Sequence, residues 1–218
     1  LMSGPTGLTA SALQRYLRAR GISWDEAALA IVGWEGTDRD AVRDRRAATL
    51  RAFRQHGAVS LGKRVGASWQ RNRFHGPYLR DALMDAGYLV ETVETATEWS
   101  GLKGLRAAVH GALETSLTSP YVMSHISHVY ETGASLYTTV LAVADQVDPV
   151  GQWTQAKRAV TDAIMGHGGT LTHHHAVGRD HAPWLEDEVG PLGLRVLRSV
   201  KETVDPSGAM NPGVLIAE

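Results

Sequence analysis

The sequence predicts an α+β fold, in which a mostly antiparallel sheet carries its helices on one side. Two β-like runs, 121–130 and 134–143, are separated by a short turn that ends in Gly133, and such a turn favours a hairpin with Gly in a left-handed conformation. A third run, 88–97, is rich in β-branched residues. Between these runs, Leu and Val recur every three or four residues over 102–117, which predicts a helix.

Upstream of this region the sequence predicts two helices and a strand. The first helix covers 9–21, with Thr9 as its N-cap. The short apolar run 27–34 (AALAIVGW) is bounded by Gly and predicts a buried strand. Asp38 is then expected to cap an amphipathic helix that ends near Gly57.

The remaining segments are predicted to be mainly helical. Residues 62–86 have helical spacing on both sides of a Gly-Pro pair, and another helix covers 153–164. The sequence GHGG at 166–169 stops that helix, and a short strand is expected to lead into three histidines. A last helix over 184–204 is broken at 205–208. The order of elements is typical of a ferredoxin-type arrangement.

Composition excludes several classes of function. Hydrophobic residues make up 43% and charged residues 21% of the chain, as in an ordinary globular protein. A net charge of −1 gives no general attraction to nucleic acid. The absence of cysteine excludes disulfides and thiolate chemistry and fits a reducing compartment such as the cytoplasm. The abrupt opening LMSGP, followed at once by a helix signal, predicts a fragment of a longer protein.

Three consecutive histidines in GGTLTHHHAVG are the strongest chemical signal. In an extended backbone His173 and His175 point to one side and His174 to the other. Three interpretations remain open. His173 and His175 could bind a metal with Asp180 or His181, the imidazoles could bind an anion or a substrate, or the segment could be an exposed polar turn.

Other polar residues have weaker patterns. His125 and His128 face opposite sides of a strand and are not expected to serve one site directly. Tyr137, in the next strand, has the pattern of a half-buried core residue, although a tyrosine can also act as a general acid or base. Arg80 suits a phosphate or carboxylate, or forms a surface pair with Asp81.

Four segments together resemble a known family. The ending DPSGAMNPG, after the helix LGLRVLRSVKETV, resembles the C-terminus of FAD-linked oxidases of the vanillyl-alcohol-oxidase type. GTLTHHHAVG, SHVYETGASLY at 127–137 and YLRD at 78–81 are similar to the alkyldihydroxyacetonephosphate synthase branch. Ala176 stands where that branch has the first Gly of Gly-Val-Gly, so we expect no Gly-only backbone angle there.

The resemblance implies a two-domain enzyme whose FAD-binding domain is not in this chain. Residues 1–180 would be the substrate-binding cap, and 181–218 a helical tail that returns to the FAD domain. FAD would be bound mainly by the missing domain. The implied reaction exchanges the acyl group of acyl-dihydroxyacetone phosphate for a fatty alcohol and forms an ether lipid without net redox change.

The resemblance also implies residue roles. Tyr137, His174 and His175 would be catalytic. Substrate binding falls to Arg80, His173 and His128, and contact with the flavin falls to His173, His174 and Asn211. No metal is implied.

Two alternatives stay open at this stage. One is an FAD-linked oxidase or dehydrogenase of a hydroxy acid, against which the triple histidine argues. The other is a non-enzymatic module that binds a lipid or a partner. For the enzyme we expect a homo-oligomer in the cytoplasm with peripheral membrane contact, and an isolated chain that is inactive.

Overall fold

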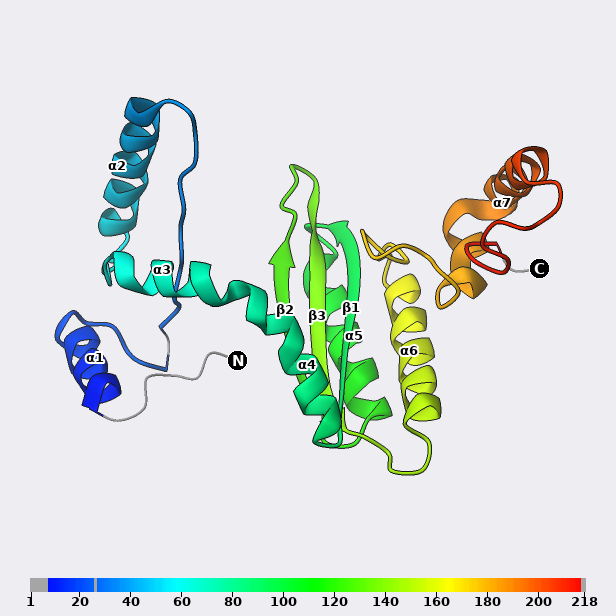
Figure 1. The fold of residues 1–218 in the computed structure, drawn as a ribbon, viewed down its shortest axis with the longest axis horizontal. Coiled ribbons are helices and arrows are strands. Elements are labelled where there is room, and N and C mark those ends of the chain that lie inside the picture. Colours follow the sequence, from blue (N-terminus) through cyan, green and yellow to red (C-terminus); the bar gives the residue numbers. More distant parts are fainter. Residues whose placement is uncertain (1–7, 26, 217–218) are drawn as a thin grey trace. The chain divides into compact units, whose positions relative to one another are not determined.

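A three-stranded antiparallel sheet is the centre of the larger of two units in this chain (Figure 1). The computed structural model describes residues 8–25 and 27–216, with side chains from residue 11 on, so the opening LMSGP lies outside the described residues. One unit extends to Gly76 and the other begins at Pro77. The strands are β1 Tyr88–Glu98, β2 Tyr121–Ser127 and β3 Gly133–Val143.

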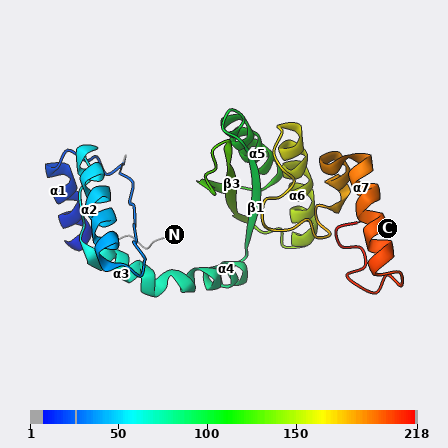
Figure 2. The same ribbon diagram turned by 90° about the horizontal axis from the view of Figure 1, so that it is seen from above.

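The central strand β3 pairs antiparallel with both neighbours, which gives the order β1-β3-β2. Two helices, α5 Leu102–Ser116 and α6 Pro149–Gly166, pack on one face of the sheet (Figure 2). Their shared core contains the fully buried side chains of Leu105, Leu113 and Ile164. The predicted α+β fold, with helices on one side of an antiparallel sheet, is therefore confirmed.

Strand alternation divides the residues of β3 between two faces. Leu136 and Val140 belong to the core under the helices, and Thr138 has the same parity. Tyr137 therefore points to the opposite face, which we call the open face. Val93 of β1 is paired with Thr138 and faces the helices, whereas its neighbour Glu94, paired with Tyr137, belongs to the open face. The open face is where polar side chains collect.

The edge of β1 is covered by the segment that follows α6. The Thr170 amide donates to the Ala96 carbonyl at 2.9 Å, as a neighbouring strand would. The Ala96 amide, however, donates to the Thr170 hydroxyl at 2.9 Å and not to a main-chain carbonyl. Because a side chain takes one of the ladder positions, the short strand predicted here does not form. The segment lies where the fourth strand of a ferredoxin-type sheet would pair.

The hairpin between β2 and β3 differs from its prediction. β2 ends at Ser127, and the left-handed residue is His128 (φ 45°) rather than Gly133. Gly133 begins β3, where a Cβ atom would overlap the Thr97 carbonyl oxygen and lie 2.9 Å from the Glu98 Cα. Glycine is needed at this position because β1 passes close to it, not because of a positive φ.

The unit that extends to Gly76 is helical where it is regular. It contains α1 Leu8–Ala19, α2 Arg39–Gln55, α3 Lys63–Asn72 and the short 3-10 helix η1 Arg73–His75. Asp38 caps α2 as predicted, and its carboxylate accepts from the Asp40 and Ala41 amides. Thr9 lies inside α1, so its prediction as the N-cap is wrong.

The strand predicted over 27–34 is also wrong. This segment is irregular, and Leu29 and Val32 are exposed. Among the described residues of this unit no strand pairs with it, so its backbone has no ladder and its apolar side chains have no core.

The larger unit contains α4 Gly76–Asp85 from Pro77 on and ends in a helical tail. The tail consists of the 3-10 helix η2 Ala182–Trp184 and α7 Leu185–Val204, which is kinked at Gly190. A second, smaller core contains Leu171, Leu185 and Leu194. Within the described ranges, no helix is long and apolar enough to cross a bilayer.

Replacing Gly133 with Ala is expected to destabilise the larger unit by roughly 1–3 kcal/mol, because the added methyl group forces β1 and β3 apart. Urea denaturation followed by circular dichroism measures this loss. Gly104→Ala is the control. A Cβ at Gly104 in α5 meets nothing within 4 Å, and this variant should gain up to about 1 kcal/mol. Equal stability of the two variants would show that β1 leaves room for a side chain at position 133.

Candidate functional site

A row of three polar side chains crosses the open face of the sheet. Glu94 of β1 and His125 of β2 are each directly opposite Tyr137 of β3. The rings of His125 and Tyr137 stack with their centroids 5.0 Å apart and an interplanar angle of 26°. The phenol is therefore held on a rigid strand, with a carboxylate on one side and an imidazole on the other.

The three consecutive histidines gather around Glu94. We call residues 168–178 the His loop. His174 Nδ1 lies 2.8 Å from Glu94 Oε2, His173 Nδ1 lies 3.6 Å from Oε1, and His175 Nε2 lies 3.7 Å from Oε2. The loop bends at these residues, so His174 does not point away from its neighbours and the predicted alternation is wrong.

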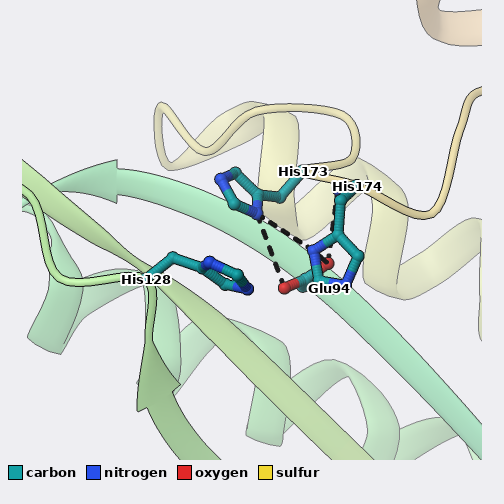
Figure 3. A group of neighbouring side chains, drawn as sticks. All are labelled: Glu94, His128, His173 and His174. Atoms are coloured by element: carbon teal, nitrogen blue, oxygen red, sulfur yellow. Dashed lines mark hydrogen bonds and ion pairs between the residues drawn. The ribbon is translucent and has the colours of Figure 1, made fainter. Parts of the chain in front are cut away.

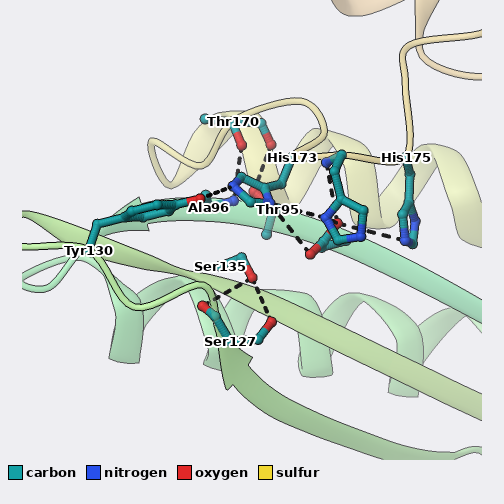
Figure 4. A network of polar contacts seen from close by, with 10 residues as sticks. Thr95, Ala96, Ser127, Tyr130, Ser135, Thr170, His173 and His175 are labelled. Atoms are coloured by element: carbon teal, nitrogen blue, oxygen red, sulfur yellow. Dashed lines mark hydrogen bonds and ion pairs between the residues drawn. The ribbon is translucent and has the colours of Figure 1, made fainter. Parts of the chain in front are cut away.

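The His loop is fastened along β1 by consecutive strand residues (Figure 4). Thr95 Oγ1 donates to the Thr170 carbonyl at 2.6 Å, and Thr97 Oγ1 donates to the Gly168 carbonyl at 3.1 Å. Together with the two bonds of Ala96, these contacts fix where the loop crosses the sheet edge. Sequence-distant residues meet here because α6 returns the chain to that edge.

His128 reaches the same cluster from the end of β2. Its left-handed backbone turns the ring toward the His loop, with centroids 4.9 Å from His173 and 5.0 Å from His174 (Figure 3). Tyr130 Oη lies 3.1 Å from His173 Nε2. The expectation that His125 and His128 cannot share a site is wrong, because β2 ends before His128 and strand alternation no longer applies.

His175 connects the loop to Tyr137. Its ring meets the Tyr137 ring edge-on at a centroid distance of 5.4 Å. The phenol is therefore bordered by His125 and His175. Imidazole nitrogens and a phenol can both donate and accept hydrogen bonds, so these three side chains can contact a polar molecule placed on the open face.

Two predicted site residues lie elsewhere. Arg80 of α4 donates through Nε to the Val90 carbonyl at 3.2 Å, and its Nη2 pairs with Glu91 Oε1 at 2.8 Å. Val90 and Glu94 are about 13 Å apart along β1. Asn211 is exposed in the tail and has φ 49°. The structure therefore places neither residue in the cluster.

The tail nevertheless docks on the end of the His loop. The Leu215 amide donates to the Gly178 carbonyl at 2.9 Å, and Arg179 Nη2 donates to the Pro212 carbonyl at 3.0 Å. Before this junction, Ala176 has φ 66°, a left-handed angle that favours Gly. The expectation that no such angle is required at Ala176 is wrong, since the loop keeps that backbone shape with Ala.

Glu94 is the central residue that sequence reasoning missed. Its side chain is fully buried, and Oε1 has no hydrogen-bond partner among the described residues. An available signal was an acidic residue in the middle of a β-branched run, since a buried carboxylate is costly unless it is paired. The contact of His125 with Tyr137 was not predicted either.

His181 lies beyond the cluster and is buried. Burial lowers its pKa, and the nearby charge of Lys157 lowers it further. His181 Nδ1 lies 3.1 Å from the Val177 carbonyl. The ring therefore contacts the end of the His loop at Val177 and does not form a site with His173 and His175.

Comparison with known proteins finds a matching family and several sequence relatives of this chain. The family of FAD linked oxidases, C-terminal domain, matches residues 6–215. An alkyldihydroxyacetonephosphate synthase from Dictyostelium discoideum is 31% identical over 214 residues, covering 95% of this chain and 35% of that protein. The synthase from Trypanosoma brucei brucei is 26% identical, covering 90% of this chain and 33% of that protein.

A solved structure agrees with these sequence relatives. A crystal structure of alkyldihydroxyacetonephosphate synthase superposes with a TM-score of 0.63 at 25% identity, covering 97% of this chain and 36% of that one. The resemblance predicted from the sequence is confirmed. This chain spans about a third of the length of these relatives.

Acid is expected to weaken the larger unit partly through His181. Its folded pKa is lowered from 6.5, so it stabilises the fold fully above pH 6.5, and this contribution is lost as the pH falls from there through the folded pKa. His181→Gln should reduce the slope of unfolding free energy against pH below 6.5 by up to about 1.4 kcal/mol per pH unit. Urea titrations across that range measure the slope, and an unchanged slope would refute the assignment.

Proposed function

This chain belongs to the family of FAD linked oxidases, C-terminal domain, and from that premise we propose that it is the substrate side of an ether-lipid synthase. The proposed reaction replaces the acyl group of acyl-dihydroxyacetone phosphate with a fatty alcohol. The row of Tyr137, His125 and Glu94 beneath the His loop is the observation that carries the proposal.

FAD is proposed to be held mainly by a part of the protein outside these residues. The open face fits the edge of a flavin, because His174 and His175 are partly exposed there and offer ring donors beside Tyr137. Asn211 is proposed as a further contact. Gly166–Gly169 is not a phosphate-binding loop, since the irregular residues 170–178 and not a helix follow it. Bound FAD would supply an electron-accepting ring against which the substrate carbon reacts.

Tyr137 is proposed to move the proton at the substrate carbon next to the carbonyl. The exchange balances in atoms and protons: the bond between the dihydroxyacetone carbon and the ester oxygen breaks, and the acyl group leaves with that oxygen as a carboxylic acid. The alcohol oxygen bonds to the same carbon, and the hydroxyl hydrogen that the alcohol loses is the one that the acid gains. Tyr137 can take up and return a proton within this cycle, and His125 and His175 border its ring and can relay it. β3, paired on both edges, holds the phenol in place.

Arg80 is proposed to bind the substrate phosphate, with His173 and His128 nearer the reacting part. The Arg80 guanidinium uses one nitrogen on the Val90 carbonyl and another on Glu91, which leaves further N–H donors for a phosphate. Its distance along β1 from Glu94 suits a substrate whose phosphate lies away from the reacting carbon.

The organisation of the whole protein is part of the same proposal. Residues 1–180 would form the cap and 181–218 the tail that returns to the FAD domain. We also propose a homo-oligomer that works in the cytoplasm and takes up its lipid substrates at a membrane surface.

Replacing Tyr137 with Phe is expected to lower formation of ether product about 100- to 10,000-fold, because it removes only the hydroxyl group that carries the proton and keeps the ring. The full-length protein is assayed with acyl-dihydroxyacetone phosphate and radiolabelled fatty alcohol. Tyr121→Phe is the matched control, since Tyr121 is an exposed tyrosine of β2. Equal activity of the two variants would remove Tyr137 from the mechanism. Reduction of the flavin by a simple hydroxy acid would instead favour a dehydrogenase.

Arg80→Gln is expected to raise KM for the phosphorylated substrate about tenfold or more while leaving kcat nearly unchanged, because it removes charge-assisted hydrogen bonds to phosphate. Glu91→Gln should have the opposite effect. It frees Arg80 from its ion pair and should lower KM for the phosphorylated substrate. Steady-state kinetics on both variants decide the point, and a KM that is unaffected in Arg80→Gln would exclude phosphate binding there.

A further inference from the structure

We propose that Glu188 of α7 is a positioning residue that holds the His loop in place for the reaction by binding the main-chain amide of Leu171. That amide donates a hydrogen bond to Glu188 Oε2. Leu171 lies two residues before His173, so the bond acts where the chain enters the three consecutive histidines. Glu188 would thus add a residue of the proposed tail to the site, and its role in the reaction rests on the proposed function.

The sheet alone does not hold the histidines. Side-chain and main-chain groups of residues 95–97 bind the loop at Gly168 and Thr170. The next amide along the loop, that of Leu171, is bound by α7 and not by β1. The support of the loop therefore changes from the sheet to the tail helix just before the histidines.

Carboxylates hold main-chain amides on both sides of His173. Glu188 accepts from the Leu171 amide. Glu94 Oε2 accepts from the His174 amide at 3.4 Å. Hydrogen bonds to a charged acceptor are stronger than those between neutral groups. With both amides held, the backbone at His173 is fixed in the orientation that directs its ring toward Glu94.

Apolar packing fixes the same part of the loop. Leu171 is fully buried in a small core with Leu185 and Leu194 of α7. Val177 packs against this core. Leu171 and Val177 lie two residues before and two residues after the run of histidines. Both ends of that run are therefore attached to α7, and a shift of this helix would move the imidazoles relative to the sheet.

The segment 185–189 carries Glu188 and is separated from the rest of α7 by a kink. Gly190 has φ 73°, a left-handed angle that interrupts the helix. Trp184 Nε1 donates to Asp162 Oδ1 of α6 at 2.6 Å, which fixes the start of the segment. Glu188 is therefore held by a short helical piece that is attached to the helix preceding the His loop.

The test is hydrogen exchange measured by NMR on the 218-residue chain. Glu188→Ala should raise the exchange rate of the Leu171 amide about tenfold or more, because a bond to a charged acceptor is lost. It should also shift the ring signals of His173 and His174. The amide of Leu113, in the core of α5, is the internal reference and should exchange at its usual rate.

Three further variants separate the reach of the side chain from its charge. Glu186→Ala removes an acidic residue from the same first turn of α7 and should leave the Leu171 exchange rate unchanged. Glu188→Gln keeps the length of the side chain and an oxygen acceptor, whereas Glu188→Asp keeps the charge and loses one methylene group. The Leu171 rate should stay closer to that of the unchanged chain in Glu188→Gln than in Glu188→Asp. These two variants decide the point even where Glu188→Ala destabilises the fold.

Three outcomes of these exchange measurements would overturn the proposal. The first is an unchanged Leu171 rate in Glu188→Ala, and the second is an equal rise in Glu186→Ala. The third is the reverse order of Glu188→Gln and Glu188→Asp, which an effect of charge on the helix dipole predicts.

Kinetics of the full-length protein test the role in the reaction. Glu188→Ala should lower kcat for ether product about tenfold or more, because displaced groups of the site react slowly. KM for the phosphorylated substrate should stay nearly unchanged, since Arg80 keeps its contacts on β1. An unchanged kcat would overturn this role. Absence of ether product from the unchanged protein would instead overturn the proposed function, and the exchange rates would still decide how the loop is held.

Discussion

A carboxylate buried in the edge strand of a sheet is the constraint on which the rest of this site depends. Glu94 lies among Val93 and Thr95, in a strand whose other side packs on the helical core. A negative charge in that position must be compensated, and the nearest compensating groups are the imidazoles of the His loop. The bend of the loop at its histidines brings these groups to Glu94, while the hydrogen bonds of Thr95, Ala96 and Thr97 fix where the loop crosses the sheet edge.

Much of the fold could be predicted from local sequence patterns, because the spacing of apolar residues shows which side of a helix or strand is buried against the core. The Leu and Val spacing over α5 and the β-branched run of β1 each have a single apolar face, and both were predicted correctly. The run 27–34 has the same composition as a buried strand but lacks a pairing partner among the described residues. Composition cannot reveal whether a partner exists. For the same reason the segment at Thr170 was expected to be a strand, although a hydroxyl takes its ladder position.

The site was predicted in part. His128 and the three consecutive histidines do converge, and Tyr137 faces them. Glu94 and the stacking of His125 could not be found from spacing, because both depend on strand register, which is set by pairing over the whole length of β3. The orientation of His174 was mispredicted because strand alternation was applied to a bend. Arg80 and Asn211 lie outside the cluster, and their proposed roles depend on a substrate and a flavin rather than on neighbouring side chains.

The substitution of a loop for the fourth strand has a consequence for self-association. An edge strand with unpaired amides and carbonyls is a template for pairing with another copy of the chain. On β1 the backbone of Ala96 is occupied by Thr170, and the Thr95 and Thr97 hydroxyls bind the same segment. Any motion that lifts the His loop from Tyr137 also uncovers this edge. Access to the site and protection against edge-to-edge aggregation are thus governed by one segment, and a variant made for wider access would also be made more prone to polymerise.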